Sequence, residues 1–421
     1  LASRERIMEI ISTELREVRT LFAVPRRTEI TEWAGDLDDE DLIEREDMVV
    51  TITSGGYIKR TPLVEFRAQR RGGKGLASMA TKEDDVVTTL FVANTHTQLL
   101  FFTTDGMVYS LKCWRLPLAG RTSKGKAIVN ILPIPQGVSI AALMPVDAPE
   151  EEWDDYQVFF ATSDGDVRRN ALSDFAKVMK NGKRAMELPE GVTLVDTRMC
   201  TEEDDIMLVM AGGRAIRFPV PEVRVFKGRS STGVRGVRLA AGDKVVSMSV
   251  IRHFEAEAWE RAEFLKRFRT ELGAEEELEA DAEEDTPAAE GQLSDERYAE
   301  MRAAQDLILT ITATGLGKIS SSHDYPVRGR GGQGVGAFKM SGRSGALVAS
   351  FPVETSDQIM LATSTGQSIR CPVAGISFRS RSAGGVKVFN TGAEEEVVTV
   401  ARVADQGDED GENNPPENGE T

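Results

Sequence analysis

VVTITSGGYIKR (residues 49–60) decides the fold, because its pattern returns five more times along the 421 residues. It combines an apolar strand, a glycine turn and a second strand that ends in basic residues. Glycine supplies the positive φ of a tight turn without steric cost, so the pattern predicts a β-hairpin. The other copies are LLFFTTDGMVYSLK (99–112), VFFATSDGDVRR (158–169), MLVMAGGRAIR (207–217), LILTITATGLGKIS (307–320) and MLATSTGQSIR (360–370).

A second glycine-containing segment follows each hairpin, 17 to 20 residues beyond the turn glycine. Successive turn glycines are 48 to 59 residues apart once the 52 residues 253–304 are set aside. A period near fifty with four short strands per unit is typical of propellers, in which neighbouring blades bury each other's faces. We therefore expect an all-β, propeller-like array of six four-stranded blades over residues 48–404, interrupted by an insertion at 253–304. A pair of β-sandwiches is the alternative.

The segments outside the repeats differ from them in composition and periodicity. Apolar residues recur at helical spacing between Arg4 and Phe22, which predicts an amphipathic helix in the first 27 residues. Residues 28–47 form an acidic linker, and the start of the insertion has helical periodicity. Beyond Gly273 the insertion is Glu/Ala-rich, and residues 405–421 contain almost no apolar side chains, so we expect disorder in both.

The net charge of -17 is an average over unlike parts. The stretches 28–47, 253–304 and 405–421 carry -9, -11 and -7, which leaves +10 on the other 332 residues. A basic array with acidic appendages is compatible with a polyanionic partner.

Basic residues concentrate around the second glycine of every unit. In a closed array these loops occupy equivalent positions, so we expect a basic belt around the perimeter that binds duplex DNA and bends it. Glycines in RRGGKG and RGRGGQG would let backbone N–H groups approach phosphate. No helix is suited to base readout, so binding should be independent of sequence. The expected DNA contacts are Arg70, Arg71, Lys74, Arg121, Lys124, Lys126, Lys180, Lys183, Arg184, Lys227, Arg229, Arg235, Arg328, Arg330, Arg379, Arg381 and Lys387.

The sequence lacks the motifs of several classes of enzyme and binding protein. There is no Walker A, HExxH or GxSxG motif, so we expect no catalytic, cofactor-binding or metal-binding residue. Cys113, Cys200 and Cys371 are scattered, which favours three buried reduced thiols over a disulfide or zinc site. Without a long apolar run or a signal peptide, we expect no membrane contact and a cytoplasmic location.

QRRGGKG (69–75) is identical to the GyrA box, the motif of the first blade in the C-terminal DNA-wrapping domain of the A subunit of bacterial DNA gyrase, a type IIA topoisomerase. The resemblance extends over nearly the whole chain, through ELREVRTLFAVPRRTEIT (14–31), DLIEREDMVVTITSGGYIKR (41–60), VANTHTQLLFFTTDGMVYSLK (92–112) and STGVRGVRLAAGDKVVSM (231–248). The insertion 253–304 is the main departure from this family.

The resemblance implies a six-bladed β-pinwheel whose blades exchange strands and whose rim wraps duplex DNA. Gln69, Arg70, Arg71, Gly72, Gly73, Lys74 and Gly75 would form the box, with its three bases on phosphates, and the loop would latch blade one to the last blade. Residues 1–27 would be the end of the breakage-reunion domain. The chain would be a monomeric, non-catalytic part of an A2B2 holoenzyme with the gyrase B subunit, which introduces negative supercoils using ATP and Mg²⁺ bound elsewhere. The C-terminal domain of a topoisomerase IV subunit, or a propeller scaffold for protein partners, is the alternative.

Overall fold

The structure, a computed structural model, describes residues 3–24, 39–53, 55–66, 76–77, 87–138, 140–178, 181–228, 231–273, 291–365, 367–392 and 395–403. The chain divides into two compact units, residues 1–43 and 44–421. The first contains helix α1 (Arg4–Phe22), which confirms the predicted amphipathic helix, and a 3-10 turn η1 (Asp39–Leu42) within the acidic linker. None of the described helices is long and apolar enough to cross a bilayer.

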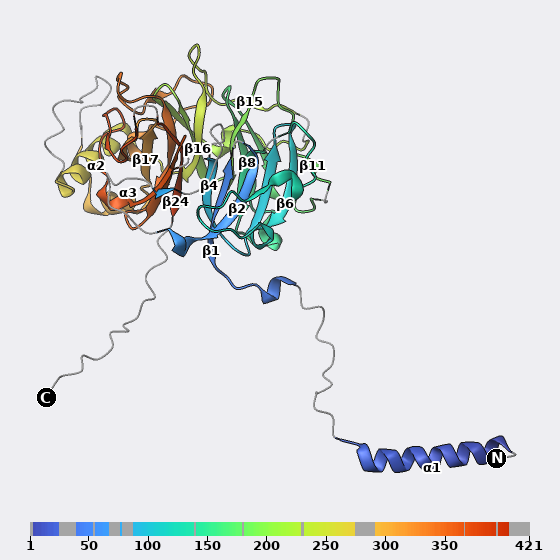
Figure 1. Cartoon of the computed structure of the whole chain (residues 1–421). Coiled ribbons are helices and arrows are strands. Elements are labelled where there is room, and N and C mark those ends of the chain that lie inside the picture. Colours follow the sequence, from blue (N-terminus) through green and yellow to red (C-terminus); the bar gives the residue numbers. More distant parts are fainter. Residues whose placement is uncertain are drawn as a thin grey trace, which may run out of the picture. The chain divides into compact units, whose positions relative to one another are not determined.

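In the described part of the second unit the strands form six antiparallel sheets of four strands each, the predicted blades (Figure 1). Each unit of sequence supplies a hairpin and a third strand to its own blade. The hairpin strands are β1 (Asp47–Thr53) and β2 (Tyr57–Pro62), β5 (Gln98–Thr103) and β6 (Met107–Lys112), β9 (Gln157–Thr162) and β10 (Asp166–Ala171), β13 (Asp204–Met210) and β14 (Arg214–Pro219), β17 (Leu307–Thr312) and β18 (Leu316–Ser321), and β21 (Gln358–Thr363) and β22 (Gln367–Pro372).

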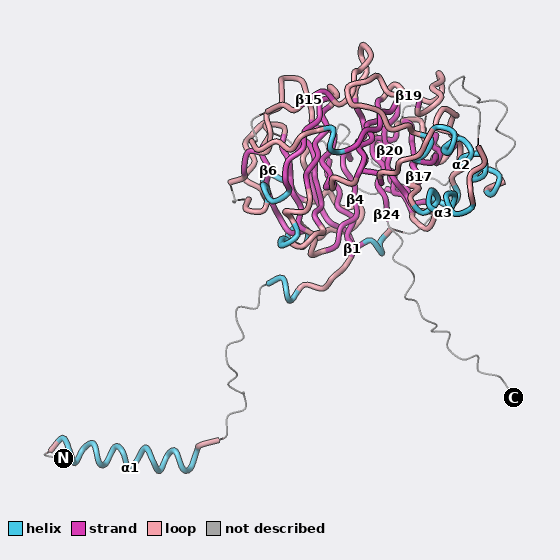
Figure 2. The backbone as a smooth tube through the Cα atoms, turned by 180° about the vertical axis from the view of Figure 1, so that it is seen from behind, coloured by secondary structure: helices cyan, strands magenta, loops and turns pink. Residues whose placement is uncertain are grey.

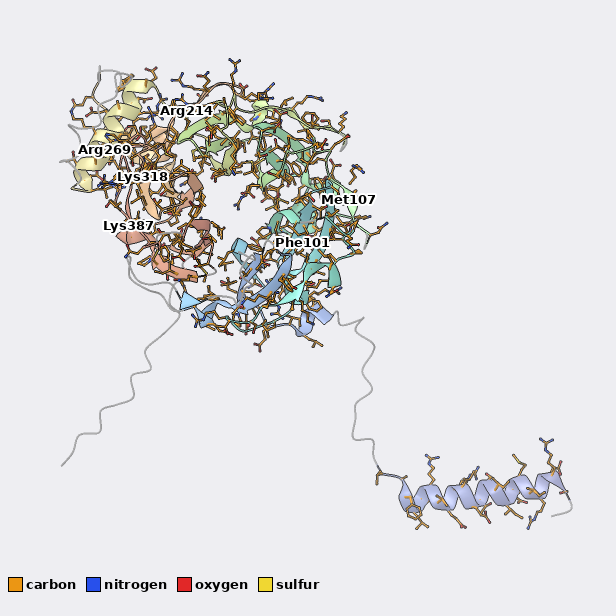
Figure 3. All side chains as sticks on the ribbon, turned by 45° about the horizontal axis from the view of Figure 1, so that its top comes forward. Phe101, Met107, Arg214, Arg269, Lys318 and Lys387 are labelled. Carbon is orange, nitrogen blue, oxygen red and sulfur yellow. The ribbon has the colours of Figure 1, made fainter. Side chains whose placement is uncertain are left out.

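The third strand of each blade borders the axis of the ring, around which Figure 3 shows the sheets arranged. Most neighbouring members of this set contact one another from blade to blade, as expected for inner strands. They are β4 (Val87–Asn94), β8 (Ile140–Val146), β12 (Leu194–Cys200), β16 (Val245–Arg252), β20 (Leu347–Val353) and β24 (Val397–Val403).

The fourth strand of each blade comes from the next unit of the sequence and forms the outer edge. These two-residue strands follow the second glycine of each unit, and each pairs with the outer hairpin strand of the preceding blade. They are β7 (Lys126–Ala127), β11 (Lys183–Arg184), β15 (Val234–Arg235), β19 (Val335–Gly336), β23 (Val386–Lys387) and β3 (Leu76–Ala77). Strand exchange therefore links all successive blades.

The ring closes through β3 of the first unit, which pairs with β22 of the last blade. Ala77 lies opposite Gln367 and Leu76 opposite Ser368 in this short ladder. The first and last blades, which lie far apart in the sequence, are thus joined by the same backbone pairing that connects the other blades. The predicted latching loop 69–75 lies outside the described residues, directly before β3.

The hydrophobic core is divided among the six junctions between blades. Strand β5 shows how the sequence achieves this: Leu99 and Phe101 pack toward blade one, whereas Leu100 and Phe102 pack toward blade three. Successive side chains of a strand point to opposite faces, and both faces are buried here. The continuous apolar runs of the hairpins are therefore required by the packing.

The described residues of the insertion, 253–273 and 291–304, form a folded helical element on blade five, which corrects part of the prediction. Helix α2 (Ala258–Glu271) agrees with the expected periodicity, but α3 (Asp295–Ala303) lies where disorder was expected. Ser294 caps α3 by accepting from the backbone N–H of Arg297, and Tyr298 and Met301 anchor it in the core. Low-complexity composition hid these anchors. Residues 274–290 and 405–421, the remainder of the disorder prediction, lie outside the described residues.

Short 3-10 turns end the hairpins and complete the described secondary structure. They are η2 (Leu63–Glu65), η3 (Cys113–Arg115), η6 (Leu172–Phe175), η7 (Val220–Glu222), η9 (Ser322–Asp324) and η10 (Val373–Gly375), with η4 (Ile128–Asn130) and η5 (Glu150–Glu152) in connecting loops.

Candidate nucleic-acid interface

The described members of the predicted basic set lie in the loops and strands of the outer edge, since they flank the exchanged strands. Lys387, for example, belongs to β23 and lies on the outer side of the ring (Figure 3). The exposed members are Lys126, Arg184, Lys227, Arg235, Arg328, Arg330 and Lys387, and the half-buried ones are Arg121, Lys124, Lys183, Arg379 and Arg381. Together these twelve residues are called the rim bases below. The 69–75 motif with Arg70, Arg71 and Lys74, as well as Lys180 and Arg229, lies outside the described residues.

Several rim bases are oriented by contacts with neighbouring loops. Arg330 donates through Nε to the carbonyl of Glu222 and through Nη1 to that of Arg235, both at 3.0 Å. Lys124 places its ammonium 3.7 Å from the centre of the Tyr57 ring. Such contacts reduce side-chain freedom before any ligand binds, which lowers the entropy cost of binding.

Three buried cations that the sequence analysis did not single out hold the rim loops from within. Lys59, Arg168 and Lys318 occupy the same position of the outer hairpin strand in blades one, three and five, and each is at most 1% exposed. Blades two, four and six have Tyr109, Ile216 and Ile369 at that position. The third residue after each hairpin turn was the available signal.

These cations donate to backbone carbonyls of the basic loop contributed by the next unit. The ammonium of Lys318 lies 2.7 Å from the carbonyl oxygens of Ser380 and Ala383 and 2.5 Å from that of Arg381. Lys59 donates in the same way to Gly120 and Arg121. Each loop therefore wraps around a buried positive charge that fixes its backbone.

Arg168 completes the series by donating to the carbonyls of Gly228 and Ser231. For Lys59, burial lowers the pKa to about 8, an effect opposed by Glu65 and reinforced by Arg121.

Second glycines such as Gly125 and Gly334 have a structural role that the sequence analysis did not predict. Gly125 and Gly334 have φ of +80° and +71°, and a Cβ at either would lie 2.5 Å or less from a carbonyl oxygen of the preceding blade. Glycine is therefore required for the exchanged strand to approach its neighbour. The N–H of Gly331 in RGRGGQG donates to Gly236 at 2.6 Å, so the expected phosphate contact is wrong for that group.

The thiols agree with the prediction of scattered buried cysteines. Cys113, Cys200 and Cys371 are free and buried, and burial raises their pKa values to about 11, 12 and 12. Among the described residues, no three His, Cys, Asp or Glu side chains come together as a metal site.

Comparison with known protein families identifies the family to which this propeller is similar. The model of the DNA gyrase C-terminal domain, a β-propeller, matches residues 47–94, 97–147, 156–201, 204–252, 306–354 and 357–404, which are the six blades. The chain belongs to this family. The match omits the helical insertion, so the insertion lies outside the repeats that define the gyrase C-terminal domain.

Curated relatives of this gyrase domain are A subunits of DNA gyrase. The protein from Rickettsia bellii is 42% identical over 420 residues, covering 98% of this chain and 45% of the relative. The protein from Granulibacter bethesdensis is 44% identical over 411 residues, covering 95% of this chain and 44% of the relative. The chain thus spans under half the length of these relatives.

Two solved structures share the fold of the gyrase family. A DNA gyrase A C-terminal domain has a TM-score of 0.66 at 19% identity and covers 85% of this chain and all of its own. The C-terminal domain of a DNA topoisomerase IV has a TM-score of 0.54 at 22% identity, covering 86% of this chain and 94% of its own. The predicted six-bladed β-pinwheel is confirmed.

Proposed function

We propose that the chain binds duplex DNA along its rim, without sequence preference, and bends the duplex around the ring. The observation that carries this proposal is the recurrence of bases at equivalent outer-edge positions of successive blades. A curved row of positive charge matches the regular row of phosphates on DNA, and neutralising phosphates releases counterions.

The proposal extends to the protein of which the chain is a part. Its relatives are A subunits of DNA gyrase, and in an enzyme of that kind the wrapped DNA would be presented as a transfer segment for ATP-dependent negative supercoiling. Catalytic, ATP and Mg²⁺ sites would lie in other domains and in the B subunit of an A2B2 complex in the bacterial cytoplasm. The chain by itself would be monomeric and would need no cofactor.

The primary test measures duplex affinity over a range of salt concentrations. Replacing the exposed Lys126, Arg184, Lys227 and Arg328 with Ala should weaken binding and reduce the slope of log K against log salt by about 3 to 4, at about 0.9 per lost phosphate contact. The control replaces Arg198 on inner strand β12 and Lys244 beside inner strand β16, which should leave the slope unchanged. An equal effect of the two sets, or no binding by the unaltered chain, would contradict the proposal.

Wrapping is tested separately by closing nicked plasmid with ligase in the presence of the chain. A chain that wraps DNA shifts the linking number of the product, whereas one that only binds does not. A protein-binding scaffold would give neither salt-sensitive binding nor a shift.

A further inference from the structure

The helical insertion packs on the outside of blade five as a folded unit. Figures 1 and 2 show α2 and α3 side by side next to β17. Phe264, Phe268, Tyr298 and Met301 form their shared core, and Phe264 stacks on Phe268 with ring centres 5.7 Å apart. The ends of the insertion are tied together, because the backbone N–H and the guanidinium of Arg252 both bind the carboxylate of Asp306.

The insertion contacts a rim loop directly through Phe268. The ring of Phe268 meets that of Phe378 edge-on, with centres 5.2 Å apart. Phe378 belongs to residues 376–383, the loop that leads to β23 and carries Arg379 and Arg381; this segment is called the sixth rim loop. Its backbone follows β18, since Arg379 N–H donates to Ile319 at 2.8 Å. Phe268 therefore covers the sixth rim loop next to the segment that carries Arg379 and Arg381.

Polar side chains also link the insertion to the sixth rim loop. Asp324, in η9 and only 15% exposed, accepts from the backbone N–H of Arg381 at 2.8 Å and faces the Arg381 guanidinium at 3.6 Å. The guanidinium of Arg269, on α2, lies 3.6 Å from the same carboxylate. Arg269 and Arg381 thus share one anion, so the insertion and the sixth rim loop are linked electrostatically.

We propose that the insertion is a positioning element of the DNA-binding rim, which holds the sixth rim loop in the conformation that presents Arg379 and Arg381. This inference rests on the proposed DNA-binding function. Lys318 fixes the loop from inside the blade, and α2 fixes it from outside. A loop held on both sides loses less conformational entropy when it binds phosphate.

The charge of the two helices favours positioning over competition with DNA. Together α2 and α3 contain six acidic and six basic residues. Many of them are paired within the insertion, as Arg297 is with Glu260 at 2.9 Å and Arg267 with Asp295 at 2.7 Å. The described helices therefore present no acidic face that could replace DNA on the rim.

The test uses the full chain with both contacts removed, Phe268→Ala and Arg269→Ala. We expect several-fold weaker duplex binding and a salt slope reduced by about 1 to 2, measured well below the unfolding temperature. Met301→Ala, on α3 in the core of the insertion, should lower thermal stability comparably without changing the slope. Lys266→Ala, exposed on the same helix, should change neither.

Two outcomes would overturn the inference: an unchanged slope in the double variant, or an equal reduction in Met301→Ala, which would make the effect one of stability alone. Failure of the unaltered chain to bind duplex DNA would instead contradict the proposed function. A variant with residues 254–304 replaced by a short glycine linker tests the same point. It should show the double variant's reduced slope, because the Arg252–Asp306 pair holds the chain ends together.

A double-mutant cycle tests whether Arg269 influences DNA binding through Arg381. If Arg269 acts by orienting Arg381 through Asp324, then Arg269→Ala should weaken DNA binding less when Arg381 is already Ala. Additive effects would show that Arg269 does not act through Arg381 and would contradict the positioning role.

Discussion

The guanidinium of Arg370, on blade six, donates to the backbone carbonyl of Phe66, at the end of the first hairpin, at 3.0 Å. Arg60 makes the same contact to Leu116 of the next unit at 2.9 Å, and Arg217 donates to Tyr325 at 3.4 Å. All three arginines follow the hairpin turn by the same number of residues. The junction that closes the ring therefore uses the same latch as the internal junctions.

Arg370→Met should open this junction locally without unfolding the other blades. Removing the donor leaves a carbonyl without its charged partner, which costs about 1 to 3 kcal/mol of unfolding free energy. Hydrogen exchange should accelerate at the amides of β3 and β22, whereas the matched variant Arg60→Met should act at β2 and β7. Uniform acceleration over all blades in both variants would contradict a latch specific to each junction.

Most of the fold was predictable because a glycine at a constant position in each repeat marks the turn of its hairpin. Gly56 and Gly315, for instance, have φ of +73° and +75° at the hairpin turns where glycine was expected. Strand exchange followed from family resemblance, because a two-residue strand such as β19 has no periodicity that identifies its partner. Helix α3 was missed because its anchors, Tyr298 and Met301, stand in a stretch dominated by charged residues.

The predicted rim is only partly visible in the sequence. Exposed bases such as Lys126 and Arg328 were placed by their proximity to the second glycine. Lys59, Arg168 and Lys318 have the same residue types but lie on hairpin strands that are buried between blades, whereas Lys126 lies on a short exchanged strand at the outer edge. Spacing alone cannot distinguish a base that binds phosphate from one that binds backbone carbonyls.

Lys318→Ile tests the role of the buried cations. It gives blade five the side chain that blades four and six have at this position, but it deprives three carbonyls of their donor. We expect a loss of about 2 to 4 kcal/mol in unfolding free energy by urea titration, together with weaker DNA binding. Lys387→Ile, on exposed strand β23, should change stability by about 0.5 kcal/mol or less and lower only DNA affinity. Equal stability losses in the two variants would contradict the assignment.

The docking of the insertion should depend on pH through His323. This side chain is 2% exposed, contacts the rings of Phe254 and Phe264, and has Nε2 2.8 Å from the carbonyl oxygen of Met301. Burial lowers its pKa to about 4, with Arg217 and Arg261 acting in the same direction and Met301 and Asp306 opposing. The unfolded chain therefore takes up a proton near pH 6.5 that the folded chain binds only near pH 4.

The contribution of neutral His323 to the free energy of unfolding is accordingly fully present above pH 6.5 and is lost as the pH falls toward 4. His323→Gln, which keeps a donor for Met301 but does not titrate, should show a smaller drop in the urea midpoint between pH 7 and pH 4.5. Carboxylates titrate in both proteins, so the difference between the two curves is the measurement. Parallel curves would show that His323 is not the titrating group.

The three thiols should be unreactive in the folded chain. Because burial raises their pKa values, the thiolate fraction at pH 8 is very small, and reagent cannot reach the sulfur atoms. Ellman's reagent should modify none of Cys113, Cys200 and Cys371 within minutes under native conditions, and all three in denaturant. Rapid native modification of one cysteine, identified by mass spectrometry, would indicate local opening of its blade.

The motif at 69–75 should contribute more to wrapping than to binding. It immediately precedes β3, the strand that joins blade one to blade six, so DNA that contacts both blades must pass the point where the ring closes. Replacing Arg70, Arg71 and Lys74 with Ala leaves the rim bases of the other units, and we expect duplex affinity to fall by less than tenfold at low salt. The linking-number shift of ligated plasmid should nevertheless be lost. Three alanines placed at Lys126, Arg184 and Lys227 provide the matched control, which should weaken binding by a similar factor but retain part of the shift. A normal shift in the 69–75 variant would contradict a special role of the motif.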